Sequence, residues 1–286
     1  MERVVEIAID ERISPYHKGN PLFAKDLREQ GTYLGHLNII LGAYYRVTGS
    51  KKYKMLNEKI TLHLQKGILN EKTRHIRSYP SISEKWPADH AAILYSLWIY
   101  DHNFGTNISE KPIKEWLEFM RIHGTDEKTG LHIAEITGNY KNGFYPRGSA
   151  LAWSIGYMSA FAPQEATRLW EKYKEHFSAM PNTSLQGFRE WPRGVSLPAD
   201  ADSGPIISGT GVSATVFSIR ASKGVGDNVT YAYLSSLIST GTTLARVLPL
   251  FVGQETTQYY LGNDATSNTL STAILFNADS TCNCWF

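Results

Sequence analysis

The sequence has few cysteines and almost no net charge. Its two cysteines, Cys282 and Cys284, both stand close to the C-terminal end. They supply neither a disulfide framework nor a zinc site, since a structural zinc ion needs about four ligands. The net charge of +2 over 286 residues leaves no marked basic excess. Charge therefore indicates neither a nucleic-acid partner nor attachment to a membrane surface.

Long apolar runs are also missing. The longest uncharged run, 203–219, is crowded with Ser, Gly and Thr, and it falls short of the roughly 20 mainly apolar residues of a membrane-spanning helix. The N-terminal stretch has charges scattered among its apolar residues, unlike a signal peptide. We expect a soluble chain without a transmembrane segment, in one domain spanning 1–286. Neither the compartment nor the oligomeric state is indicated.

What the sequence does contain is an internal repeat. Four segments, beginning at Gly31, Trp86, Tyr145 and Pro198, each place a polar residue in an aromatic or Gly-rich loop and continue into a helix of small and apolar residues. The marker residues of these segments recur about every 55 positions and are His36, Asp89, Arg147 and Asp202. A weaker copy begins near Asn263. This period is roughly the length of one helical hairpin that includes a long loop.

The helices expected between these segments have one apolar face. In 109–124, Ser109 is a candidate cap, Pro112 suits a first turn, and the apolar positions have helical spacing. They are Ile113, Trp116, Leu117 and Met120. In 163–177, Pro163 opens a helix whose apolar stripe is Ala166, Leu169, Trp170, Tyr173 and Phe177. The stretch 51–66 has a similar pattern, with Tyr53, Leu56, Ile60 and Leu64 toward the core.

Alternation of one-faced and uncharged helices predicts two layers. A helix without a polar face is buried on all sides, whereas an amphipathic helix covers it from outside. We therefore expect an all-α fold, an α/α toroid with about five to six helical hairpins. The loops that enter its inner helices would gather at one end of the ring. There we expect to find His36, Asp89, Arg147, Glu190, Asp200 and Asp202.

Two of these aspartates have two interpretations. Asp89 and Asp202 stand where Asp commonly caps a helix N-terminus. Carboxylates at the mouth of a helical barrel are also candidates for acid and base catalysis. Because a capping carboxylate can also be catalytic, both interpretations stay open.

Other motifs give little support to a cofactor or a metal ion. Gly209, Gly211 and Ala214 fit the dinucleotide pattern G-x-G-x-x-A, but no strand precedes them, and we interpret the glycines as packing positions. The histidines at positions 63, 75, 102, 123, 132 and 176 lack ligand spacing. We interpret each as exposed or as satisfied within the core. No cofactor and no metal are expected.

Three segments carry a resemblance to a known family. "WPADHAAILYSL", "YPRGSALAWSIGYMSAFAPQEATRLWEKYKEHF" and "ADADSGPIISGTGVSAT" are similar to a bacterial family of α/α-toroid proteins related to the linalool dehydratase/isomerase-like domain. The similarity covers roughly residues 20–225. It implies a six-hairpin barrel with an acid/base site at its mouth, lined at the matched positions by Asp89, Arg147 and Asp202. The cysteine roles of the dehydratase itself have no counterpart, because both cysteines here are C-terminal.

Three classes of function remain open. The first is a carbohydrate-active enzyme, a glycoside hydrolase or lyase, with Asp89 and Asp202 as the catalytic acid/base pair. Its expected substrate-binding residues are His36, Trp86, Tyr145, Arg147, Glu190, Trp191 and Asp200. Arg147 would bind an acidic group or position a carboxylate, and the aromatic residues would stack on sugar rings. The second class is a cofactor-independent hydro-lyase or isomerase acting on a small alcohol. The third is a binding or structural toroid without chemistry. The expected partner is a small molecule or an oligosaccharide.

Overall fold

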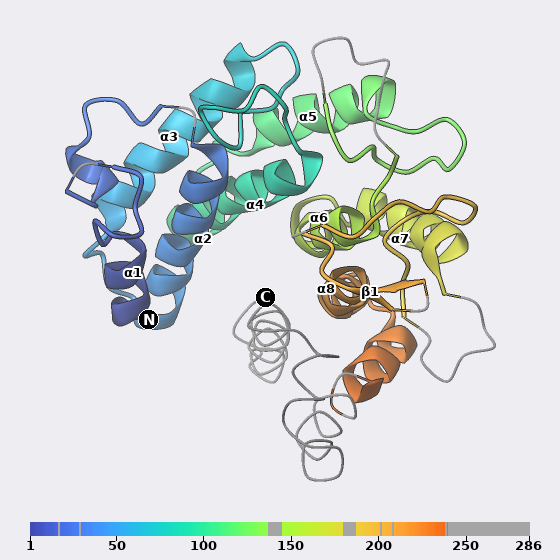
Figure 1. Cartoon of the computed structure of the whole chain (residues 1–286). Helices are drawn as coiled ribbons and strands as arrows, with labels where there is room; N and C mark the ends of the chain where they lie inside the picture. Colours follow the sequence, from blue (N-terminus) through green and yellow to red (C-terminus); the bar gives the residue numbers. More distant parts are fainter. Residues whose placement is uncertain are drawn as a thin grey trace. The chain divides into compact units, whose positions relative to one another are not determined.

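The chain forms two compact units, Met1–Phe144 and Tyr145–Phe286. The computed structural model describes residues 1–16, 18–28, 30–136, 145–179, 187–200, 202–207, 209–237 and 239. The repeat expected near Asn263 and the two cysteines lie outside the described residues. Figure 1 labels the helices and strands along the chain.

Unit 1 is built from helices. They are α1 (Glu2–Ala8), the short 3-10 helix η1 (Pro21–Phe23), α2 (Gly31–Thr48), α3 (Lys54–Asn70), α4 (Pro87–Phe104) and α5 (Glu110–His123). Helix α2 packs along α4, and α3 covers both from one side. The side chain of Lys59 on α3 donates hydrogen bonds to three carbonyl groups of the η1 region, those of Pro21, Leu22 and Ala24. The N-terminal segment is therefore fastened to the helical body.

Unit 2 has the same character with one small addition. Its helices are α6 (Gly148–Phe161), α7 (Pro163–Phe177) and α8 (Val212–Gly224), and residues 228–237 are helical as well. Strands β1 (Ile206–Ile207) and β2 (Thr210–Gly211) form an antiparallel hairpin directly before α8. Gly209 in the turn of this hairpin has a φ of +81°, a conformation that favours glycine. Helix α6 packs against both α7 and α8.

The predicted alternation of buried and one-faced helices is confirmed. Helix α4 is buried along most of its length, and α6 is similar. Helix α7 buries the whole predicted stripe, Ala166, Leu169, Trp170, Tyr173 and Phe177, each fully. On α5, Trp116 and Met120 are fully buried, while Ile113 and Leu117 are half-buried. The mostly helical architecture agrees with the all-α class expected from the sequence.

Glycines allow the buried helices to approach closely. A methyl group at Gly35 of α2 would lie 2.7 Å from a side-chain carbon of Ile93 on α4. A methyl group at Gly148 would lie 3.0 Å from Cβ of Ala214, near the start of α8. These separations are shorter than ordinary carbon contacts, so neither position has room for a larger residue.

Within each unit, the buried helices start at the same end. In unit 1, the Thr32 hydroxyl in the first turn of α2 donates to Asp89 in the first turn of α4, at 2.6 Å. In unit 2, the first residue of α6 meets the third residue of α8, as the contact of Gly148 with Ala214 shows. The loops that enter these helices therefore lie together within each unit, while the predicted gathering of all of them at one end of a ring stays a prediction.

Three capping expectations are wrong. Asp89 lies inside the first turn of α4, where Trp86 holds the N-cap position and no side-chain cap forms. Ser109 makes no side-chain cap on α5, because its hydroxyl instead donates to Asp101 at 2.6 Å. Asp202 does not cap α8, because the β1–β2 hairpin intervenes and Gly211 holds the cap position. The helix expected over 51–66 begins at Lys54 and continues to Asn70.

No helix among the described residues is both long enough and apolar enough to span a membrane.

Candidate functional site

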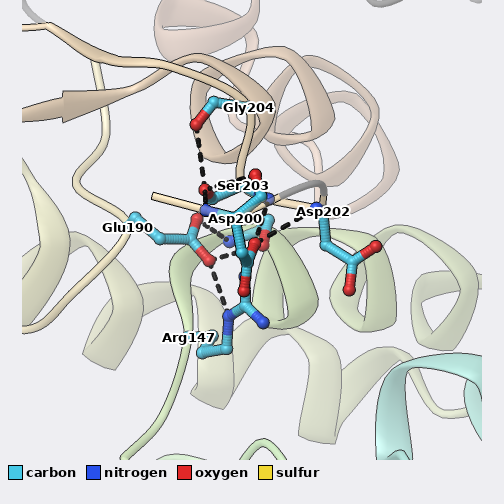
Figure 2. Close-up of polar contacts among 7 residues, drawn as sticks. Arg147, Glu190, Asp200, Asp202, Ser203 and Gly204 are labelled. Carbon is cyan, nitrogen blue, oxygen red and sulfur yellow. Dashed lines mark hydrogen bonds and ion pairs between the residues drawn. The ribbon is translucent and has the colours of Figure 1, made fainter. Parts of the chain in front are cut away.

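Arg147 holds two carboxylates in unit 2. It occupies the N-cap position of α6. Its Nε donates to Oε1 of Glu190 at 2.8 Å, and its Nη2 donates to Oδ1 of Asp200, also at 2.8 Å. Figure 2 shows the guanidinium group facing both carboxylates. From the sequence, Arg147 was expected either to bind an acidic group of a ligand or to position a carboxylate. The two contacts seen here are of the second kind.

Glu190 is the buried member of this group. Its side chain has no exposed surface. Besides Arg147, the carboxylate accepts from the Ser149 hydroxyl at 2.7 Å and from the Ser149 backbone N–H at 3.1 Å. Burial raises the pKa of Glu190, although its hydrogen bonds with Ser149 and Arg147 act in the opposite direction. Glu190 thus fixes both the start of α6 and the orientation of Arg147.

Asp200 is the accessible member. Its side chain is 49% exposed. Three donors reach its Oδ1, namely Arg147 Nη2 and the backbone N–H groups of Asp202 and Ser203. In the described part of the chain, no donor reaches Oδ2. Burial alone would raise the pKa of Asp200, but the hydrogen bonds from Ser203 and Arg147 outweigh it, so the pKa is lowered. Asp200 is therefore an oriented carboxylate with one oxygen still open.

Asp202 follows Asp200 in the same turn but points elsewhere. Its backbone N–H donates to Asp200 at 3.1 Å, while its own carboxylate is exposed and is directed away from Arg147 in Figure 2. The turn is closed by Ser203, whose hydroxyl accepts from the Asp200 N–H and donates to the Gly204 carbonyl. The loop thus fixes Asp200 more firmly than Asp202.

Two aromatic residues of the sequence prediction lie in the same unit. Arg147 stacks on Trp191, with its Cζ 5.2 Å from the ring centroid, a cation–π geometry. The Trp191 Nε1 atom is buried and has no hydrogen-bond partner among the described residues. Tyr145 is 52% exposed just before α6. Arg147 therefore contacts both an aromatic ring and an oriented carboxylate.

The remaining predicted residues belong to unit 1. Asp89 accepts from Thr32, and the backbone carbonyl of Thr32 is in turn hydrogen bonded to Nδ1 of His36 at 2.8 Å. Trp86 is half-buried and lies edge-on to Tyr79, with ring centroids 6.2 Å apart. The expected pairing of Asp89 with Asp202 involves residues of different units and stays a prediction.

Two serines of the site were not singled out from the sequence. Ser149 holds Glu190, and Ser203 holds the turn around Asp200. A possible signal was their position, since each follows a charged residue closely and Ser149 stands in a helix first turn, where Ser often bonds to the backbone or to nearby acids. Among the described residues, no group of three His, Cys, Asp or Glu side chains is arranged to hold a metal ion.

Solved structures resemble this chain, although no family model matches it. A glycoside hydrolase of family 105 from C. acetobutylicum ATCC 824 aligns with a TM-score of 0.55 at 12% identity, over 74% of this chain and 63% of its own. Cellobiose 2-epimerase from Bacillus thermoamylovorans B4167 aligns with a TM-score of 0.56 at 10% identity, over 88% of this chain and 76% of its own. This chain therefore spans less than two thirds of the hydrolase.

Both of these proteins are α/α-toroid enzymes. At such low identity, the likeness defines the architecture and leaves the chemistry open. Together with the alternating helices of the two units, it identifies the fold of this chain as an all-α toroid.

Proposed function

We propose that this protein is a carbohydrate-active enzyme in which Asp200 acts as the catalytic base. The observation that carries the proposal is the geometry of this carboxylate. Its Oδ1 is fixed by three donors, while Oδ2 faces no donor among the described residues and the side chain is half exposed. A base needs to be ionised, oriented and within reach of a proton.

The surroundings of Asp200 suit this role. The lowered pKa keeps the carboxylate ionised at neutral pH. Arg147 orients it, and the buried Glu190 in turn orients Arg147. In this arrangement Arg147 and Glu190 are positioning residues, whose effect on a substrate passes through Asp200.

Sugar as the substrate class is supported by two further points. Trp191 supplies aromatic surface against Arg147, which holds the carboxylate, Tyr145 is exposed two residues before Arg147, and aromatic rings commonly pack against the apolar faces of sugars. The similar structures are a glycoside hydrolase and a cellobiose epimerase, and both of these named activities act on sugars. A base can activate water for glycoside hydrolysis, or it can remove a proton from a sugar carbon.

Such chemistry also needs a proton donor. We assign this role to Asp202, one of the pair expected from the sequence, because it is the exposed neighbour of Asp200 in the same turn. Asp89 belongs to unit 1, where it accepts from Thr32, and its catalytic role stays a sequence prediction. The hydro-lyase activity implied by the linalool dehydratase/isomerase-like resemblance stays a second prediction, and a binding toroid stays the third.

The test is a substrate panel with a matched pair of variants. The purified protein is incubated with neutral oligosaccharides, uronic-acid oligosaccharides and terpenoid alcohols, and products are followed by chromatography and NMR. On the sugar that is converted, Asp200→Asn should lower kcat about 10²–10⁴-fold, as expected for loss of a general base. Asp89→Asn and Asp202→Asn then identify the proton donor.

Asp126→Asn is the control. Asp126 is also a loop aspartate that accepts hydrogen bonds from a nearby backbone N–H and hydroxyl, those of Thr129, but it belongs to unit 1 and is not one of the residues of the proposed site. It should leave kcat unchanged. Unchanged turnover in Asp200→Asn would refute the role of Asp200. Conversion of terpenoid alcohols alone would favour the hydro-lyase, and binding without conversion of any compound would favour the binding toroid.

A further inference from the structure

Three histidines are buried around one tryptophan in unit 1, and one of them, His90, directly follows Asp89 in α4. His75 lies between α3 and α4, His90 lies in α4, and His132 follows α5. Their exposed fractions are 0%, 1% and 2%. The ring centroids of His75, His90 and His132 lie 6.0, 5.8 and 5.7 Å from that of Trp116 on α5. We call these four residues the histidine cluster.

The hydrogen bonds of His75 require its neutral form. Trp116 Nε1–H donates to Nε2 of His75 at 2.9 Å. An indole N–H can only donate, so this nitrogen has to carry a lone pair. The other nitrogen, Nδ1, lies 2.6 Å from the backbone carbonyl of Thr73 and donates its hydrogen there. A second proton on the ring would set two N–H groups against each other.

His90 is buried without polar partners. Neither of its ring nitrogens has a hydrogen-bond partner among the described residues. Its ring lies against His75, with centroids 4.6 Å apart. An imidazolium ion here would find no acceptor, and burying an unpaired charge is far more unfavourable than burying a neutral ring.

The charged groups nearby do not favour a cation. Lys85 precedes α4 and is itself nearly buried, with its ammonium group bonded to Glu71 and Thr73. Its positive charge lowers the pKa of both His75 and His90, in addition to the larger effect of burial. Other charged groups on the packed elements include Glu71, the partner of Lys85, and Arg74, which stands next to His75 and pairs with Glu115 of α5 at 3.0 Å. Asp89 stands next to His90, Glu135 belongs to the segment 131–136, and His123 lies against Phe119 of α5.

The neutral cluster ties together four parts of unit 1. It joins the segment 71–76, the start of α4, the middle of α5 and the segment 131–136. In addition, the backbone of Lys85, just before α4, forms an antiparallel bridge with Ile136 at the end of the segment 131–136. Unit 2, by contrast, has a single histidine, His176, which is half-buried on α7.

We propose that the histidine cluster is an acid-sensitive lock on unit 1. At neutral pH it holds α4 and α5 to the two connecting segments. In acid, protonation of the cluster breaks the Trp116–His75 hydrogen bond and releases these elements, while the helices of unit 2 stay packed.

The sign and size of the effect follow from linkage. Burial lowers the pKa of His75 to about 3 and that of His90 well below its ordinary value. In the unfolded chain both would titrate near 6.5. Stability is therefore full above about pH 6.5 and falls as the pH drops below it. At pH 5, each of the two histidines raises the unfolding equilibrium constant about 30-fold, or about 1,000-fold together.

The first test compares His90→Leu with His102→Leu by denaturant unfolding between pH 7.5 and 4.5. His102 lies on the same helix but is exposed. Between pH 7.5 and pH 5, the unfolding equilibrium constant of His90→Leu should rise about 30-fold less than that of the wild type. The rise for His102→Leu should be closer to that of the wild type. Equal pH dependence in His90→Leu and the wild type would overturn the proposal.

Two measurements on the wild type do not depend on a variant folding. In NMR titration, the ring signals of the two buried histidines His75 and His90 should stay in the neutral form at pH 5. Hydrogen exchange, corrected for intrinsic rates, should show loss of protection in α4 and α5 before α7 as the pH falls. Ordinary titration of all histidines, or simultaneous loss of protection in both units, would overturn the lock.

Discussion

Oε1 of Glu190 lies 2.8 Å from Nε of Arg147, with the carboxylate fully buried and the guanidinium side chain only 17% exposed. The same guanidinium group reaches outward to Asp200. One arginine therefore connects an inaccessible acid to an accessible one. Because burying a charge without a partner is unfavourable, the inner acid and the arginine depend on each other.

Replacing the inner acid tests this dependence. Glu190→Gln leaves Arg147 partly buried with a weaker inner partner, and removing one member of a buried pair is strongly destabilising. We expect the free energy of unfolding to fall by about 2–4 kcal/mol, since the amide keeps part of the hydrogen bonding. Urea unfolding at neutral pH measures this change.

The matched control is Glu118→Gln. Glu118 also bonds to an arginine, Arg121, but both side chains are more than half exposed. Such surface pairs contribute about 1 kcal/mol or less, so this variant should stay close to the wild type. A similar loss of unfolding free energy in both variants would show that burial of Glu190 does not strengthen its contribution to stability.

Asp227 should make unit 2 sensitive to strong acid. Its carboxylate accepts hydrogen bonds from Trp170, Lys174 and Thr230. Burial alone would raise the pKa of Asp227, but these bonds outweigh it and hold the pKa well below its ordinary value. Stability from this group is thus present above about pH 4 and is lost as the pH falls further.

We therefore expect Asp227→Asn to lower the free energy of unfolding by about 1–3 kcal/mol at pH 7. The difference from the wild type should shrink below about pH 4. Glu171→Gln is the control, because Glu171 pairs with the same Lys174 but is 63% exposed. A difference for Asp227→Asn that is constant from pH 7 to pH 3 would contradict this account. Thermal unfolding at several pH values would measure it.

A third prediction concerns the close approach of α6 to the loop that carries Glu190. A methyl group at Gly148 would lie 2.0 Å from the backbone carbonyl oxygen of Arg189, which cannot move aside as a side chain can. Gly148→Ala should reduce stability by about 1–3 kcal/mol through overpacking. Gly67→Ala is the control, because only the side chain of Ile76 stands near it. Equal melting temperatures for the two variants would refute the argument.

The helices were predictable because their patterns are local. The stripe from Ala166 to Phe177 repeats with helical spacing, and every member of it is buried. Pro163 opens α7 as its residue type predicts. Arg147, Glu190 and Asp200 were expected to meet because loops that enter the inner helices of a toroid gather at one end, and these three residues are in contact.

The features that the sequence did not predict depend on residues that lie far apart along the chain. The burial of Glu190 rests on Ser149, which precedes it by 41 residues, so nothing near Glu190 distinguishes it from an exposed acid. The capping role expected of Asp202 failed because two very short strands separate it from α8. His75 and His132 had been interpreted one at a time, and only the fold gathers them with His90 around Trp116.

The two contacts of Arg147 also define a closed loop. Glu190 and Asp200 stand at the ends of a stretch whose members are mostly exposed, and a single guanidinium group fastens both ends. Because Arg147 fixes both ends, the exposed residues of 193–199 can change in sequence without displacing either acid, whereas Trp191, on which Arg147 stacks, cannot. Mutational drift in this loop could therefore alter which ligands the protein accepts while its charged anchor stays in place.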